Sequence, residues 1–363
     1  MQSGCQTGAI SLSPYANFIL RWERRLNQVD PYRRITPFDW GLEWLRLTPL
    51  NGLPAHPPLA PPAEVLPALR EWSQRVVDAS HEFFAYPRVN EYQLQGDVLR
   101  YRSPVETPYE ENHYVHARWF PAAGRPRRAC IVVAQWNSDE EGHLGLARLL
   151  QRAGISALRV SMPYHDVRMP EELKRAEFTV DANIGRTIHA ARQAVCDIRA
   201  GLDWLEEQGY RSLGIVGTSL GSCYALLTSA HDARLRVNAF NHISQYFGDV
   251  VWTGLATRHV RQSLEPYIDQ AELREAWRTI SPASYLEQFA AMDRRAPKHN
   301  LLIWARYDPC FLPEFSQQVV ESFDRHRLDY EAHALPCGHY TIGRWPYKYL
   351  DAYWMVSFLR RYL

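Results

Sequence analysis

Apolar runs of strand length alternate with helical patterns from residue 130 onwards. The runs lie at residues 130–134, 157–161, 213–216, 236–240, 300–305 and 330–335. Helical patterns lie between and after them, at residues 142–153, 183–208, 222–229, 313–326 and 347–362. Two upstream segments, residues 91–101 and 114–120, are predicted to be antiparallel strands. Apolar strands that alternate with helices are typical of a covered parallel sheet. The pattern therefore predicts an α/β fold with a mostly parallel central sheet and helices on both faces.

Two regions depart from this alternation. Before residue 90 the pattern predicts helices at residues 14–26, 38–45 and 66–84, with a proline-rich link at residues 54–62. Residues 243–295 predict three more helices, at residues 245–260, 262–277 and 282–292. We therefore predict an N-terminal helical extension over residues 1–90 and a catalytic domain over residues 91–363 that carries a helical insertion.

The charge balance and the cysteines narrow the classes of partner. With 41 basic and 40 acidic residues the net charge is +1, which argues against a nucleic-acid partner. The 6 cysteines are scattered without a C-x-x-C pair, which argues against a zinc site or a disulfide scaffold. This usage predicts reduced thiols in a cytoplasmic protein. No metal or other cofactor is predicted, and a homo-oligomer stays open.

The sequence gives little support for a membrane partner. No run reaches the roughly 18 apolar residues that span a bilayer, and the first residues lack the pattern of a secretory signal. Residues 14–26 are basic and amphipathic, which also suits a membrane surface. We favour packing on the catalytic domain, because the polar face mixes Glu23 with the arginines.

A candidate nucleophile stands between a predicted strand and a predicted helix, in the sequence Gly217-Thr218-Ser219-Leu220-Gly221. A G-x-S-x-G sequence in this context predicts a nucleophile elbow, a sharp turn that pushes the serine out at the edge of the sheet. The glycines are needed because strand and helix pass too close there for side chains. The pattern alone is weak evidence, since glycine is common.

Two residues downstream of the elbow strengthen the interpretation. Asp308 comes directly after one predicted strand and His339 directly after the next. With Ser219 these residues run in the order serine, acid, histidine, and in this the chain resembles the esterase- and lipase-like serine hydrolases of the α/β-hydrolase superfamily. The resemblance covers the chain from about residue 90 to the end. It implies an α/β-hydrolase fold, with residues 243–295 as a cap over the active site.

The resemblance leaves alternatives for the triad acid and for the second oxyanion-hole donor. Asp249, after the preceding strand, is the rival acid, because some members of the superfamily place the acid there. For the oxyanion hole, the amide of Leu220 is one expected donor. The second should come from the loop after the strand at residues 130–134, where Trp136 is our choice and Asn137 the alternative.

Four further residues are expected at the substrate. Tyr164 and His165 come after a predicted strand and so border the same edge of the sheet. Phe247 and Trp252 belong to a dense apolar run in the predicted cap, where they face either the core or a pocket.

The sequence therefore predicts an enzyme that hydrolyses a small-molecule carboxylic ester through an acyl-enzyme on Ser219. Thioesterase, peptidase and acyltransferase activities on the same fold stay open, as does a non-catalytic binding protein.

Overall fold

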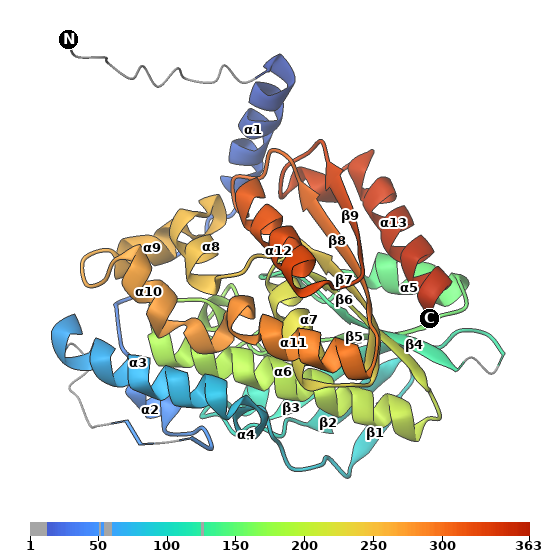
Figure 1. Cartoon of the computed structure of the whole chain (residues 1–363), viewed down its shortest axis with the longest axis horizontal. Helices are drawn as coiled ribbons and strands as arrows, with labels where there is room; N and C mark the ends of the chain where they lie inside the picture. The colour runs from blue at the N-terminus through green and yellow to red at the C-terminus, as the bar shows by residue number, and fades with distance from the viewer. Residues whose placement is uncertain (1–12, 51, 54–59, 125–126) are drawn as a thin grey trace.

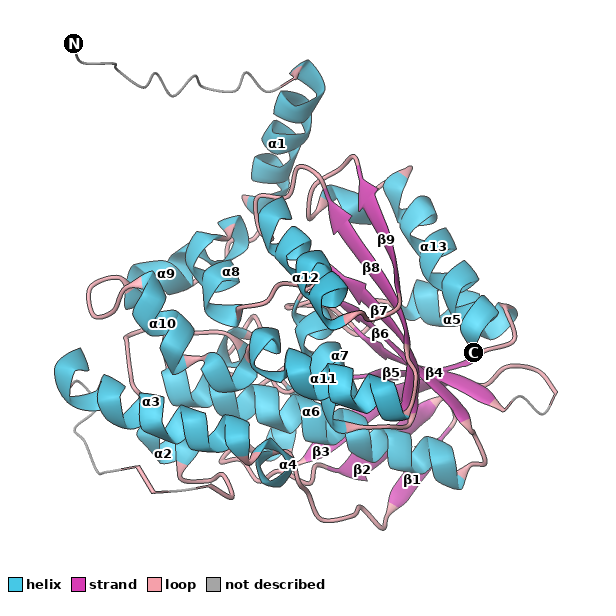
Figure 2. Ribbon diagram, viewed as in Figure 1, coloured by secondary structure: helices cyan, strands magenta, loops and turns pink. Residues whose placement is uncertain are grey.

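Within the described residues, nine strands form one sheet at the centre of the computed structural model (Figures 1 and 2). The structure describes residues 13–50, 52–53, 60–124 and 127–363. The strand order is β1-β2-β3-β5-β4-β6-β7-β8-β9. The strands are β1 Tyr92–Gln95, β2 Val98–Arg102, β3 Tyr114–Phe120, β4 Arg128–Val133, β5 Ser156–Val160, β6 Ser212–Thr218, β7 Leu235–Asn241, β8 His299–Ala305 and β9 Tyr330–Leu335. The pairings β1–β2, β2–β3 and β3–β5 are antiparallel, and all the others are parallel. The predicted mostly parallel sheet is confirmed.

Helices cover both faces of this sheet (Figure 2). The helices are α1 Pro14–Asn27, α2 Leu42–Leu45, α3 Pro62–Asp78, α4 Ser80–Phe83, α5 Leu144–Arg152, α6 Ile184–Glu207, α7 Leu220–His231, α8 Phe247–Thr253, α9 Arg258–Leu264, α10 Gln270–Ala276, α11 Leu286–Arg295, α12 Pro313–His326 and α13 Tyr347–Tyr362. Helices α5 and α13 build one core with one face of the sheet, whereas α6, α7, α11 and α12 build a larger core on the other. Within the described residues, no helix has both the length and the apolar character needed to cross a membrane.

The four parallel strands β6 to β9 determine where the loops of interest meet. The strand ends are in register, with Thr218 opposite Asn241 and Ala305 opposite Leu335. Because the carboxyl ends of neighbouring parallel strands share one edge, the loops after β6, β7, β8 and β9 emerge together.

Helix α1 stands at this carboxyl edge (Figure 1). Its Tyr15 hydroxyl donates a hydrogen bond of 2.6 Å to the carbonyl oxygen of Pro336, directly after β9. Helices α2 and α3 lie elsewhere, against α6 and α10 respectively. The predicted helix at residues 38–45 is shorter than expected, because Gly41 adopts a positive φ of 59° and α2 begins only at Leu42. Residues 54–59 of the predicted proline-rich link lie outside the described residues.

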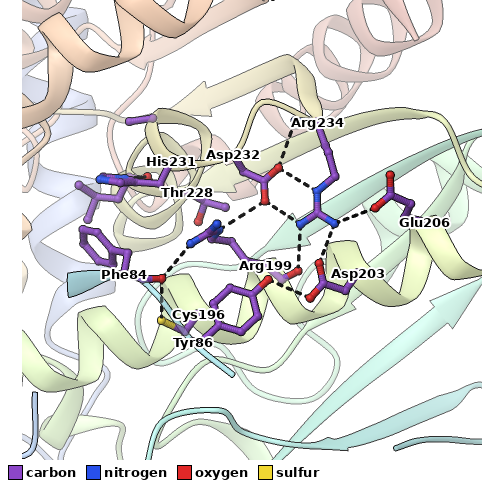
Figure 3. A network of polar contacts seen from close by, with 12 residues as sticks. Phe84, Tyr86, Cys196, Arg199, Asp203, Glu206, Thr228, His231, Asp232 and Arg234 are labelled. Carbon is purple, nitrogen blue, oxygen red and sulfur yellow. Dashed lines mark hydrogen bonds and ion pairs between the residues drawn. The ribbon is translucent and has the colours of Figure 1, made fainter. Parts of the chain in front are cut away.

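The segment between α4 and β1 is tied to α6 by a polar network (Figure 3). Arg199 Nη1 on α6 donates to the carbonyl oxygen of Phe84 at 2.8 Å, and the Tyr86 hydroxyl donates to Asp203 at 2.9 Å. Arg234 binds the other oxygen of Asp203 at 2.7 Å. These contacts join the end of the N-terminal segment to the helix that covers the centre of the sheet.

The insertion contains shorter helices than the sequence pattern predicts. The expected helix over residues 245–260 ends at Thr253, because Gly254 takes an extended conformation with ψ 137°, and a Cβ at this position would lie 2.5 Å from Val250 O. The next expected helix, over residues 262–277, is interrupted after α9, and α10 begins at Gln270, where the N-cap residue Asp269 forms a reciprocal capping box with Glu272.

Candidate active site

Ser219 occupies the sharp turn between β6 and α7, with φ 55° and ψ −119°. This is a backbone conformation that residues with a side chain rarely adopt. A Cβ at Gly217 would lie 2.2 Å from Gly221 O, and a Cβ at Gly221 would lie 2.4 Å from Ala134 O. Glycine is therefore required at both positions, and the serine stands where a nucleophile elbow places it.

Asp308 and His339 meet in the loops after β8 and β9. His339 Nδ1 lies 2.9 Å from Asp308 Oδ2 in a hydrogen bond. The other carboxylate oxygen accepts the amides of Cys310 and Phe311, both at 2.7 Å. Asp308 is thus fixed on both oxygens, and it fixes the imidazole in turn, as an orienting acid does in a triad.

The charges of this pair stabilise one another. Burial raises the pKa of Asp308, but the charge and hydrogen bond of His339, together with the close contact of His242, outweigh burial and hold that pKa well below its usual range. Burial lowers the pKa of His339, but the charge and hydrogen bond of Asp308 raise it above its ordinary value. An ionised aspartate therefore makes the histidine a stronger base.

Ser219 and His339 line the same two cavities. Among the described side chains no hydrogen bond joins the two residues. Hydrogen bonds between a nucleophile and its base are often long in unliganded sites and tighten with substrate. The rival acid Asp249 lies apart from this group, since its carboxylate binds Arg274 at 2.6 Å.

The two residues that we expect to form the oxyanion hole, Leu220 and Trp136, both line the cavities that contain Ser219. The amide of Asn137, the alternative donor, instead donates to His165 Nε2 at 3.1 Å. Burial lowers the pKa of His165 to about 4, so this ring is neutral and can accept that bond. The amide of Trp136 is therefore the better second donor.

The two cavities differ in size and in chemistry. The smaller has a volume of about 60 Å³ and the larger about 520 Å³. Apolar side chains from α7, the insertion and the loop after β8 line the smaller one, among them Leu220, Cys223, Phe247, Val250, Val251 and Phe311. Charged side chains line the larger one, among them Asp30, Arg33, Arg175, Lys348 and Asp351. Ser219 thus stands between an apolar pocket and a larger one that also carries charged side chains.

Known structures share this architecture. No protein-family model matches the chain, and no curated protein matches it in sequence. An uncomplexed acylaminoacyl peptidase from Pyrococcus horikoshii superposes with a TM-score of 0.57 at 15% identity, over 77% of this chain and 43% of that one. An orthorhombic crystal form of the same peptidase gives 0.55 at 13% identity, over 76% and 42%. A lipase in its open form gives 0.50 at 15% identity, over 70% and 97%.

The chain has the α/β-hydrolase fold. It spans less than half the length of the peptidase chains that it resembles. At these identities the likeness concerns the fold alone.

Three residues that we expected at the substrate lie elsewhere in this α/β-hydrolase fold. Tyr164 is fully buried, with its hydroxyl 3.3 Å from Thr107. His165 is engaged by the amide of Asn137. Trp252 packs beneath the guanidinium of Arg261 at 5.0 Å and lines neither catalytic cavity among the described residues. Position at a strand end and apolar character place a residue near this edge of the sheet, but they do not fix where its side chain points.

His242 is a site residue that the sequence pattern does not reveal. It comes directly after β7, is buried, and places Nδ1 3.0 Å from Asp308 Oδ2, the same oxygen that binds His339. Burial and the His339 charge lower its pKa, against the opposing effect of Asp308, so the ring is neutral. A neutral imidazole can orient Asp308 without competing for its charge.

Among the described residues, one group of side chains is spaced closely enough to bind a metal ion. It consists of His242, Asp308 and His339, whose ligand atoms lie within 4.8 Å of one another. The Nδ1 atoms of both histidines already lie 2.9–3.0 Å from the carboxylate. A metal would have to displace both contacts, so we interpret the group as two histidines held on one aspartate.

Glu23 of α1 is the second residue that sequence reasoning missed as a member of the site. It is fully buried, and its carboxylate accepts the amides of Tyr340 at 2.9 Å and Thr341 at 2.7 Å. These amides come directly after His339, so α1 holds the loop that carries the candidate base. The sequence offers one sign of this role, because Glu23 is an acidic residue within an arginine-rich helical pattern. That pattern cannot reveal a partner more than 300 residues away.

Proposed function

We propose that this chain is a serine hydrolase that cleaves carboxylic esters through an acyl-enzyme on Ser219. The 2.9 Å hydrogen bond between His339 and Asp308, beside a serine held in an elbow conformation, carries the proposal. A serine hydroxyl is a poor nucleophile until a base takes its proton, and this arrangement supplies the base and its orienting acid.

The geometry supports a role for each group. Because Nδ1 of His339 is bound to Asp308, Nε2 is the nitrogen left to take the proton from Ser219. The serine oxygen then attacks the ester carbonyl, and the amides of Leu220 and Trp136 stabilise the oxyanion. Protonated His339 gives its proton to the leaving alcohol. Water, activated by the same histidine, hydrolyses the acyl-enzyme.

The proposal is tested by labelling with a fluorophosphonate probe, which reacts with activated serines. The wild-type protein should be labelled, and the Ser219→Ala variant should not. A panel of p-nitrophenyl esters, thioesters and an N-acyl-aminoacyl amide then separates the activities. The amide is included because the similar structures include an acylaminoacyl peptidase. Faster turnover of the amide or a thioester than of every ester would replace the ester proposal.

The pH dependence should show a base that is harder to deprotonate than a free histidine. His339 must be neutral to act, and Asp308 raises its pKa. We therefore expect kcat/KM to rise with pH through a single step centred above the ordinary histidine value of about 6.5.

Asp351 provides the control for this profile. It lines the larger cavity, and burial raises its pKa to about 7, so it titrates in the same range. Asp351→Asn should leave the step in place. If the step in kcat/KM is lost in the Asp351→Asn variant, or if the wild-type profile is flat between about pH 5 and 9, His339 is not the base.

Phe247 should set the length of acyl chain that fits. It lines the apolar cavity, whose 60 Å³ holds only a few water-sized groups, since one water needs roughly 10–15 Å³. Short acyl chains should therefore be preferred. Phe247→Ala should raise kcat/KM for octanoyl relative to acetyl esters by about tenfold or more, because an apolar pocket discriminates by about 1–3 kcal/mol per methylene.

Trp252→Ala is the matched control, because it removes another cap aromatic that lies outside the cavity lining. It should leave the ratio of octanoyl to acetyl rates unchanged. If Phe247→Ala lowers the melting temperature and leaves that ratio unchanged as well, Phe247 is a core residue and the cap does not select the acyl group.

A further inference from the structure

Two arginines that line the larger cavity together with Ser219 have buried hydrogen-bond donors without a partner in the described part of the chain. Arg175 is 6% exposed, yet its Nη1 has no hydrogen-bond partner in the described part of the chain. Arg33 donates Nη2 to Asn27 at 2.6 Å and leaves a buried Nε without a partner. Buried donors normally find partners, and guanidinium donors suit carboxylates.

The charges around these donors favour an anion. Arg33, Arg175 and Lys348 line the cavity and face the carboxylates of Asp30 and Asp351. Asp30 is already engaged, because its Oδ2 lies 2.9 Å from Arg175 Nε. Asp351 is held by the side-chain amide of Asn241, and burial raises its pKa to about 7, which weakens its negative charge at neutral pH. The cationic charge is therefore only partly balanced.

Asp30 compensates the charge of Arg175 only in part. Burial lowers its pKa, and the nearby Arg33 charge acts in the same direction, against the opposing effects of Asp30, Glu177 and Tyr340. A further anion near both guanidiniums would relieve this repulsion.

The arginines adjoin the reacting centre through Trp136. The guanidinium of Arg175 lies 5.0 Å from the indole ring, on the residue whose amide we assign to the oxyanion hole. His259 stacks on the same indole at 6.0 Å and 2° between planes. Arg175 therefore lies next to the residue whose amide we expect to bind the ester carbonyl oxygen.

The sizes of the two cavities indicate which part of an ester meets the arginines. In acyl transfer the alcohol leaves first while the acyl group stays on the serine. The apolar cavity of about 60 Å³ suits the retained acyl group, and the cavity of about 520 Å³ suits the departing alcohol. The charged groups therefore face the alcohol part of the substrate.

We propose that the larger cavity is a subsite for a carboxylate on the alcohol part of the ester, bound by Arg33 and Arg175. This inference rests on the proposed function, because it names the substrate class of the same site. The ligand class is a phenol or alcohol that carries a carboxylate, and this carboxylate makes charge-assisted hydrogen bonds to the guanidinium groups.

Arg33 offers the sharper variant of the two. Arg175 also borders a second cavity that holds Asp139, Glu140 and Glu141, so its substitution changes two environments. Arg33 does not line that cavity. Its neighbour Arg34 is exposed and lines neither cavity among the described residues, so Arg34→Gln removes the same charge without touching the subsite.

Binding of the product alcohol tests the subsite without requiring turnover. In the Ser219→Ala protein, 4-hydroxybenzoate should bind about tenfold more tightly than 4-hydroxybenzamide by titration calorimetry, since a charge-assisted hydrogen bond is worth about this factor. Adding Arg33→Gln should abolish the difference, whereas adding Arg34→Gln should preserve it. Equal binding of acid and amide, or a difference that survives Arg33→Gln, would overturn the proposal.

Rates test the same preference on the intact enzyme. Butyrate esters of 4-hydroxybenzoate and 4-hydroxybenzamide should differ by about tenfold in kcat/KM after division by their uncatalysed rates, in favour of the acid. Succinate and succinamate monoesters place the carboxylate or the amide on the acyl part instead. If the enzyme prefers the carboxylate only in this second pair, the larger cavity does not bind the alcohol part of the ester. Failure to cleave any ester would count against the proposed function, while the binding comparison would still decide the subsite.

Discussion

Replacing Ser219 by alanine should lower turnover of a p-nitrophenyl ester by roughly 10⁴- to 10⁶-fold, and His339→Ala should cost about as much. The serine provides the atom that becomes acylated, and the histidine makes it nucleophilic. Each substitution therefore removes the covalent route as a whole. The measurement is kcat on purified protein with catalytic contamination excluded by a second preparation.

The double variant provides the control for this prediction. If Ser219 and His339 act as one unit, the double variant should be hardly slower than either single variant. Losses that multiply would mean that the two residues act independently, which contradicts a triad.

Asp308→Asn has the second largest expected effect, a loss of roughly 10⁴-fold in kcat. The carboxylate binds His339 Nδ1 at 2.9 Å and raises the pKa of that histidine. An amide at this position presents a donor to Nδ1 and favours the tautomer with its proton on Nε2, which cannot take the serine proton. Both effects remove the base.

Asp249→Asn is the matched control, because Asp249 is a buried carboxylate of the insertion that binds Arg274 and Gln270 rather than His339. It should change kcat by no more than a few fold and act chiefly on the melting temperature. A larger loss of kcat for Asp249→Asn than for Asp308→Asn would reverse the assignment of the acid.

The sequence predicts those parts of the site that depend on short motifs and on the order of strands along the chain. Gly217 is required by a close backbone approach within the elbow, and Gly221 by its close approach to the end of the neighbouring strand β4 at Ala134. Both approaches follow from the sharp turn that the sequence motif predicts. Asp308 and His339 come after apolar strands that end at one edge of a parallel sheet, and topology alone brings such loops together. The fold prediction succeeded for the same reason.

The parts that the sequence cannot predict depend on distant contacts. Glu23 bonds to Tyr340 and Thr341 across the whole length of the chain, and His242 meets Asp308 only because β7 and β8 are neighbours. Tyr164 lies after a strand as Asp308 does, but its side chain turns into the core. The predicted helix boundary in the insertion was wrong at Gly254, which packs against the backbone. The spacing of apolar residues along the sequence does not reveal such a contact.

The most direct test of the central claim is to locate the acyl group during turnover. Wild-type protein mixed with excess p-nitrophenyl butyrate, quenched in acid within the first turnovers and digested, should carry a butyryl group on the peptide that contains Ser219, detected by mass spectrometry. The Ser219→Ala protein should carry none. Ester turnover with the butyryl group on another residue, or with Ser219→Ala as active as the wild type, would contradict the account.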